Sequence, residues 1–163
     1  MEKEREEQVI SLCQKLIQQK SYSGEESGVV GVLSENMKQM GFDEVTVDKY
    51  GNIIGCIKGN RPGKKVLFDG HIDTVPVTEE TEWLYPPFAA EIHDGKIYGR
   101  GTSDMKGAVA AMTCTASNYA KDTGKDFAGE IYVAGVVHEE CFEGVAAREI
   151  SKNVRPDYVV IGE

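Results

Sequence analysis

Four short segments of this 163-residue sequence carry side chains that bind metal ions or transfer protons. The first, residues 70–76, contains His71 and Asp73. In an extended chain, residues two apart share a face, so both side chains point the same way. A carboxylate beside a ligating imidazole fixes its tautomer and raises its basicity. This spacing favours Asp73 as the group that orients His71. The alternative is a histidine at the end of a strand that is hydrogen-bonded to a nearby aspartate and binds no metal.

The second segment, residues 99–107, reads Gly-Arg-Gly-Thr-Ser-Asp-Met-Lys-Gly and leads into a predicted helix. Glycines permit the backbone angles of a tight turn, and this turn delivers the carboxylate of Asp104 to the start of the helix. A P-loop would end in Gly-Lys-Ser/Thr, and the dinucleotide fingerprint needs a third glycine where Asp104 stands. The alternative is that Ser103 or Asp104 caps the helix, which explains one polar residue but not the glycines.

The third segment places His138, Glu139 and Glu140 after an apolar run, and the fourth places Glu163 after another. Adjacent carboxylates leaving an apolar strand are costly unless a cation or a proton compensates them. One can bind a metal while the other takes a proton from water. The alternative is that acidic residues ahead of a helix interact favourably with its dipole. Taken together, one histidine and several carboxylates suit zinc, cobalt or manganese.

The hydrophobic pattern predicts the elements that must position these residues. Helices are expected at 4–19, after 22–27 with Gly41 near the C-cap, at 106–119 and at 144–152. Strands are expected at 45–48, 53–57, 65–68, 131–137 and 158–161, with a loop at 78–87. A hairpin joins 90–93 to 96–98 through an Asp94-Gly95 turn, which suits type I′. Strands and helices alternate in the second half, which predicts an α/β fold with a largely parallel sheet covered on both faces.

Composition limits the class of protein. The chain is 40% hydrophobic and 28% charged, as in one globular domain. A formal net charge of −9 argues against a nucleic-acid or anionic-membrane partner. The four cysteines form no Cys-x-x-Cys pair, so neither a disulfide framework nor a thiolate zinc site is expected. The N-terminus is too charged for a signal peptide and no apolar run reaches membrane-spanning length, so we expect a cytoplasmic protein.

The order and spacing of these motifs closely resemble the M20 metallopeptidase family. The matching segments are Gly70–Pro76, Trp83 with Pro87-Phe88, Asp94–Gly107, and Glu139-Glu140 followed by Gly144. The family includes acetylornithine deacetylase, succinyl-diaminopimelate desuccinylase and carboxypeptidases; within it, the sequence looks most like peptidases linked to selenium metabolism. The resemblance implies a three-layer αβα zinc-peptidase-like fold, two divalent ions (zinc, or cobalt or manganese) and a small amide or peptide substrate.

The resemblance also implies roles for individual residues. Its metal ligands would be His71, Asp104, Glu140 and Glu163, with Asp104 bridging both ions and joined to Met105 by a cis peptide bond. Its catalytic pair would be Asp73, which supports His71, and Glu139, the general base. Glu163 would bind the first ion and Glu140 the second.

Two family histidines have no counterpart in these 163 residues: a downstream ligand of the second metal and an oxyanion-stabilising residue from an inserted dimerisation domain. Neither His93 nor His138 is expected to replace the missing ligand. We therefore expect residues 1–163 to be an N-terminal portion of a catalytic domain, truncated on its C-terminal side and inactive alone. The parent protein would be a homodimer formed through the missing domain. The alternatives are a stand-alone metal-binding or regulatory fragment, and a nucleotide-binding domain built on the 99–107 loop.

Overall fold

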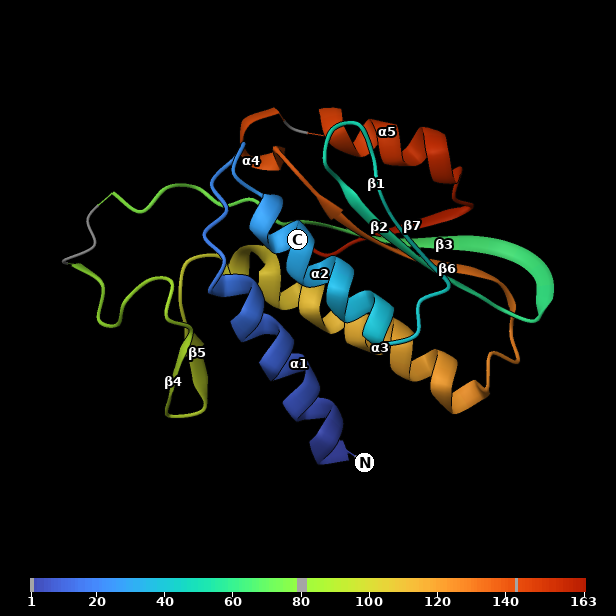
Figure 1. The fold of residues 1–163 in the computed structure, drawn as a ribbon, viewed down its shortest axis with the longest axis horizontal. Coiled ribbons are helices and arrows are strands. Elements are labelled where there is room, and N and C mark those ends of the chain that lie inside the picture. Colours follow the sequence, from blue (N-terminus) through green and yellow to red (C-terminus); the bar gives the residue numbers. More distant parts are fainter. Residues whose placement is uncertain (1, 79–81, 143) are drawn as a thin grey trace.

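A central five-stranded sheet forms the middle layer of the protein (Figure 1). The computed structural model describes residues 2–78, 82–142 and 144–163. The sheet has the order β1-β2-β6-β3-β7. Its strands are β1 Glu44–Val47, β2 Ile53–Lys58, β3 Arg61–His71, β6 Ala128–Val136 and β7 Tyr158–Ile161. Strand β3 pairs in parallel with β6 and β7, whereas β2 is antiparallel to both β1 and β6. Four strands therefore run in one direction and β2 runs opposite to them, which agrees with the predicted, largely parallel sheet.

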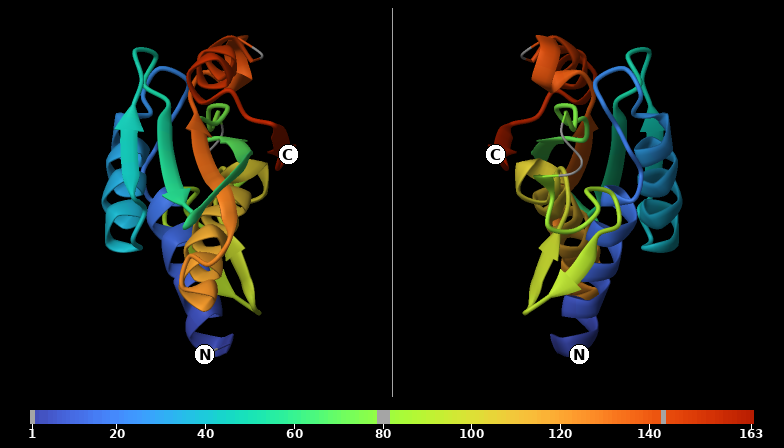
Figure 2. Two further views of the ribbon diagram at one scale, coloured as in Figure 1. Left: turned by 90° about the vertical axis from the view of Figure 1, so that its right-hand side faces the viewer. Right: turned by 90° about the vertical axis from the view of Figure 1, so that its left-hand side faces the viewer.

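Helices cover both faces of this sheet (Figure 2). They are α1 Glu2–Ile17, α2 Ser27–Gln39, α3 Gly107–Thr123, the short α4 Glu139–Phe142 and α5 Val145–Val154. On one face, Leu33 of α2 lies over Gly135 of β6, and Val109 of α3 lies over Gly70 of β3. On the other face, α5 contacts β6. The three-layer αβα arrangement is therefore confirmed.

The helices form where apolar residues recur every three or four positions, which places them on one side. On α1, for example, Leu12, Cys13, Leu16 and Ile17 are buried. Helix α2 ends as predicted near Gly41, which takes a φ of +88° that side chains disfavour. Among the described residues, no helix combines the length and the apolar character that a membrane crossing requires.

Several boundaries differ from the prediction, among them the end of α3 at Thr123 rather than residue 119 and the start of β6 at Ala128 rather than residue 131. Strand β3 begins at Arg61 rather than at residue 65, because its register shifts between Arg61 and Lys65 and this bulge accommodates Pro62. The next helix was predicted at 144–152, yet a short helix α4 precedes it and contains Glu139 and Glu140. Residues 79–81 of the predicted loop lie outside the described residues.

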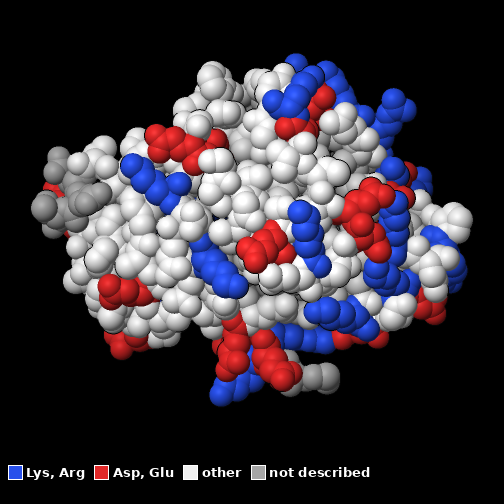
Figure 3. Space-filling view, in the orientation of Figure 1, with Lys and Arg blue, Asp and Glu red and all other residues white. Residues whose placement is uncertain are grey.

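The predicted hairpin is present as β4 Glu91–His93 and β5 Lys96–Tyr98. Asp94 and Gly95 have φ values of +50° and +73°, the positive pair that a type I′ turn requires. The hairpin projects from the body of the domain (Figure 1). On the face drawn in Figure 3, acidic and basic side chains are interspersed over the helices and the sheet edge.

Candidate metal centre

The carboxyl ends of three parallel strands bring the candidate ligands together. Pairing of β3 with β6 extends to His71 opposite Val136, and pairing of β3 with β7 extends to Asp69 opposite Ile161. The residues that follow these strands therefore meet at one edge, where ligands bind in open α/β sheets. This register explains why His71, Glu139 and Glu163 become neighbours although the sequence separates them widely.

His71 is held on both sides of its ring. The side chain is buried, with its residue only 3% exposed. Its Nδ1 lies 2.9 Å from the backbone oxygen of Asp73 and its Nε2 lies 2.8 Å from Oδ1 of Asp104. Burial disfavours the imidazolium, but hydrogen bonds with Asp73 and Asp104 outweigh it and raise the pKa of His71 to about 9. Because Nδ1 donates to a carbonyl, Nε2 is the nitrogen available to a metal ion.

The Asp73 carboxylate connects two strand exits. It is fully buried, and its Oδ2 accepts hydrogen bonds from Ser23 Oγ at 2.6 Å and from the Glu140 amide at 3.1 Å. Its Oδ1 accepts the Glu139 amide at 3.1 Å and lies 3.5 Å from His71 Nδ1. Burial would raise the pKa of Asp73, but His71 and these donors lower it below its usual range. An ionised Asp73 thus fixes the chain on both sides of the site.

The glycine-rich turn presents Asp104 to solvent while anchoring its neighbours. Gly101 has a φ of +83°, and a Cβ there would lie 2.7 Å from Thr74 Cγ2, so glycine is required. The peptide bond between Asp104 and Met105 is cis, as the resemblance implies. The Asp104 side chain is 67% exposed. The capping alternative is wrong, because Lys106 is the N-cap of α3 and no side chain caps the helix.

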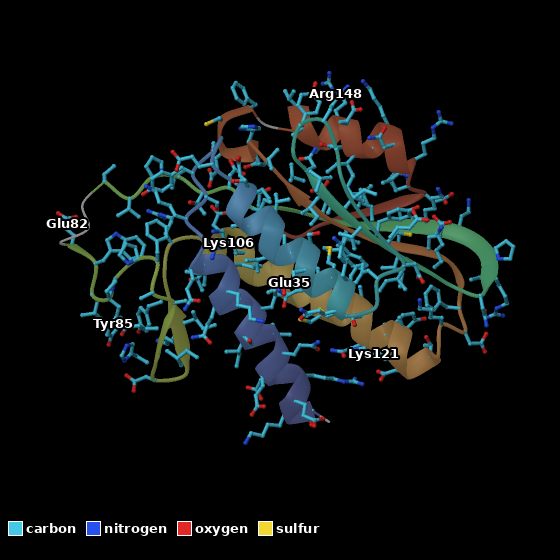
Figure 4. All side chains as sticks on the ribbon, in the orientation of Figure 1. Glu35, Glu82, Tyr85, Lys106, Lys121 and Arg148 are labelled. Carbon is cyan, nitrogen blue, oxygen red and sulfur yellow. The ribbon has the colours of Figure 1, made fainter. Side chains whose placement is uncertain are left out.

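A buried lysine fastens this turn to α1. Lys106 is fully buried, and its Nζ donates to the carbonyl oxygens of Leu16 at 3.0 Å and Gln19 at 2.8 Å (Figure 4). Burial lowers the pKa of Lys106 to about 8. The ammonium thereby satisfies acceptors at the carboxyl end of α1, where carbonyl groups lack helical partners. The loop that carries Asp104 is fixed by this contact.

The candidate ligand atoms form two overlapping groups. His71, Asp104 and Glu140 make one, and His71, Glu139 and Glu163 make the other; within each group the ligand atoms lie within 4.8 Å of one another. One imidazole nitrogen with several carboxylate oxygens fits zinc and similar divalent ions. Burial, together with the charges of Glu163, Asp73 and Glu140, raises the pKa of Glu139 despite the opposing effect of His71. This crowding of carboxylates is what a bound cation would relieve.

Two other histidines stand apart from these groups. His93 Nε2 lies 2.7 Å from Glu91 within the hairpin, and His138 Nδ1 lies 3.6 Å from Glu26. A pocket of about 190 Å³ opens beside Asp104 and Glu140, with Arg100 in its lining. A small substrate group could enter there.

Comparison with known proteins agrees with this geometry. Residues 67–163 match the model of peptidase family M20/M25/M40. The chain belongs to this family. It is 31% identical over 161 residues to succinyl-diaminopimelate desuccinylase 2 of Ruegeria sp. (strain TM1040), covering 94% of this chain and 40% of that protein. The chain therefore spans less than half the length of this curated relative.

Solved M20 structures share the fold. A metallo-carboxypeptidase of the family from Sulfolobus solfataricus superposes with a TM-score of 0.78 at 21% identity, covering 94% of this chain and 36% of that one. A dinuclear metal-binding M20 peptidase from Bacillus subtilis gives 0.68 at 17% identity, covering 93% and 40%. The predicted membership of the M20 family is confirmed.

Sequence reasoning overlooked three residues that support this candidate site. Ser23 and Glu26 hydrogen-bond to the segments after β3 and β6 that carry candidate ligands, and Lys106 fastens the turn that carries Asp104 to α1. The sequence Ser-Gly-Glu-Glu at 23–26 was interpreted only as the approach to a helix. The signal that could have drawn attention to Lys106 is a charged residue directly before the apolar first turn of α3.

Proposed function

We propose that this chain forms the metal-binding part of a hydrolase that cleaves an amide bond, in an N-acyl amino acid or a small peptide, with two divalent ions. The observation that carries the proposal is the convergence of His71 with Asp104, Glu139, Glu140 and Glu163 at one sheet edge. Membership of the M20 peptidase family supports the reaction class. The desuccinylase relative supports an N-acyl substrate, and the dinuclear Bacillus subtilis peptidase supports two ions.

The candidate ligands fall into two groups that share His71. His71 offers Nε2, and Asp104 lies 2.8 Å from it with an exposed carboxylate that can reach a second ion. Glu140 groups with His71 and Asp104, and Glu163 groups with His71 and Glu139. When bound, divalent ions would polarise the scissile carbonyl and make an attacking water more acidic. Zinc is our first choice, with cobalt and manganese as alternatives.

Glu139 is the proposed general base. Burial and neighbouring carboxylates raise its pKa, which favours a group that must accept a proton and release it again. Its backbone amide donates to Asp73, which fixes the point from which the side chain leaves the chain. Glu139 would take the proton of the attacking water and deliver it to the leaving amine.

The isolated 163-residue chain should hold one ion tightly. His71 belongs to both groups, and Nε2 can ligate a single ion at a time. Among the described residues, neither group contains a second histidine. We therefore propose that catalysis requires a further ligand and that this chain alone does not complete the reaction. The expected cytoplasmic location and homodimeric parent remain proposals of the same kind.

Calorimetric titration with Zn²⁺ and a hydrolysis assay test the proposal. We expect one tight site in the chain, lost in His71→Asn and kept in the control His93→Asn. The protein that carries this chain should hydrolyse a panel of N-acyl amino acids and dipeptides, and Glu139→Gln should abolish the activity. Equal Zn²⁺ binding by wild type and His71→Asn would refute the site. Metal binding without hydrolysis of any panel member would favour the stand-alone metal-binding alternative.

A further inference from the structure

Three consecutive amides of the turn after β6 donate to two buried carboxylates. The His138 amide lies 3.0 Å from Glu26 Oε1, and the Glu139 and Glu140 amides each lie 3.1 Å from the oxygens of Asp73. Hydrogen bonds to ionised acceptors are stronger than neutral ones. The backbone of this turn is therefore held from one side along its whole length.

Glu26 makes this contact instead of serving its own helix. It occupies the N-cap position of α2, yet its side chain makes no capping hydrogen bond. The residue is 5% exposed, and both carboxylate oxygens accept the Gly24 amide at 3.0 Å. Burying a carboxylate is costly, and Glu26 offsets part of the cost with a hydrogen bond from the His138 amide, 112 residues away. Glu26 thus joins the approach to α2 to the proposed metal centre.

The backbone conformation of His138 explains why the Glu26 contact matters for the proposed metal centre. His138 has a φ of +58°, in the left-handed region that non-glycine residues rarely adopt. Such a conformation persists only where surrounding contacts enforce it. The Glu26 oxygen accepts the His138 amide, and the next two amides are accepted by Asp73. This reversal of the chain directs the Glu139 and Glu140 side chains toward the His71 side of the turn.

Ser23 connects the segment that carries Glu26 to the Asp73 carboxylate. Its hydroxyl donates to Asp73 Oδ2 at 2.6 Å, three residues before Glu26. Ser21 secures the same segment, because its hydroxyl donates to the Ile72 carbonyl at 2.7 Å and its own carbonyl accepts the Thr74 amide at 2.9 Å. Residues 21–26 therefore contact both strand exits that supply ligands, after β3 and after β6.

We propose that Glu26 is a positioning residue of the metal centre: it fixes the His138 backbone and thereby aims Glu139 and Glu140. The proposal rests on the proposed function for its purpose, but the contact itself can be tested without metal. Removing the acceptor leaves the His138 amide without its partner, and the left-handed turn loses the bond that holds it. The ligand carboxylates would then sample other directions.

Amide hydrogen exchange of the metal-free chain, followed by NMR, tests the contact. In Glu26→Ala we expect the His138, Glu139 and Glu140 amides to exchange about tenfold faster, because the His138 amide loses an ionised acceptor. Glu26→Gln keeps an acceptor oxygen and should restore most of the protection. Glu26→Asp withdraws the oxygen by one methylene and should resemble Glu26→Ala, which decides the matter if the alanine variant does not fold. The exposed neighbour gives the control Glu25→Ala, expected to match wild type.

Cobalt titration of the same variants tests whether Glu26 positions the carboxylates that bind the metal. The absorption of bound Co²⁺ reports ligand geometry, and we expect Glu26→Ala to change that spectrum and weaken affinity about 10–100-fold, as loss of outer supports does. Unchanged amide exchange in both Glu26→Ala and Glu26→Asp would overturn the proposal, as would equal effects of Ala and Gln. If amide exchange changes but the cobalt spectrum and affinity do not, the proposal that Glu26 directs Glu139 and Glu140 is also overturned. If wild type binds no Co²⁺, the proposed function fails, while amide exchange still decides whether Glu26 holds the turn.

Discussion

The Nε2 atom of His71 lies 2.8 Å from Oδ1 of Asp104, although 33 residues separate them in the sequence. The two side chains arrive from different elements, one from the end of β3 and the other from the turn before α3. Each is fixed by a separate buried group, Asp73 for the imidazole and Lys106 for the turn. If these two side chains are metal ligands, they would lose little conformational freedom when an ion binds, because they are already in place.

Metal binding should raise the thermal stability of the chain. A ligand that binds only the folded state at 100 times its Kd stabilises that state by about 2.7 kcal/mol. We expect Zn²⁺ to raise the Tm by several degrees, a chelator to reverse the shift, and His71→Asn to abolish it, as measured by circular dichroism. His93→Asn serves as the matched control because His93 lies in the hairpin, bonded to Glu91. An equal Tm shift in His71→Asn would point to nonspecific binding.

Asp73→Asn should weaken metal binding about 10–100-fold, the usual cost of removing a group that orients a ligand. The Asp73 carboxylate accepts three hydrogen bonds, from Ser23, Glu139 and Glu140. An asparagine amide would set N–H groups against one of those donors. Competition with a chromophoric chelator measures the change, with Asp94→Asn in the exposed hairpin turn as the control. Wild-type affinity in Asp73→Asn would show that the carboxylate does not support His71.

Most of the fold could be predicted because hydrophobic periodicity reports burial directly. The strand Tyr158–Ile161 and the hairpin turn at Asp94-Gly95 match the prediction residue for residue. The early start of β3 could not be predicted, since Pro62 and Gly63 disfavour strands and are accommodated only by a bulge against β6. Pairing with the distant strand β6 decides where β3 begins, and the local composition carries no information about that pairing.

The residues of the candidate site also divide into those that a local pattern predicts and those that it does not. His71, Asp73, Asp104, Glu139 and Glu140 were predicted because their types and spacing are typical of metal chemistry. Ser23, Glu26 and Lys106 were not, because their partners lie 50, 112 and 90 residues away. Nothing in a local pattern distinguishes Glu26 from the exposed Glu25. Only the folded chain shows which of the two is buried against the site.

Lys106→Met should destabilise the protein by about 1–3 kcal/mol, the cost of leaving buried polar groups unpaired. Methionine fills the same space, but the carbonyls of Leu16 and Gln19 lose their shared donor. Urea denaturation of the metal-free chain measures the change. Lys121→Met is the control, since Lys121 lies exposed near the end of α3 (Figure 4). Equal stability of Lys106→Met and wild type would mean that water or a backbone shift replaces the ammonium.

Stability should fall as the pH rises from 9 to 11, partly through Cys114. Burial raises the pKa of the Cys114 thiol from 9.0 to about 11. Between these values the unfolded chain releases the proton while the folded chain keeps it, so alkali favours unfolding. The contribution of the thiol is fully present below pH 9, and a two-unit shift corresponds to a loss of roughly 2 kcal/mol by pH 11. Cys114→Ala should show a smaller decline than wild type in urea denaturation at pH 8 and pH 10.5, and Cys141→Ala, at an exposed thiol, should decline as wild type does. Parallel declines in wild type and Cys114→Ala would show that the buried thiol does not contribute.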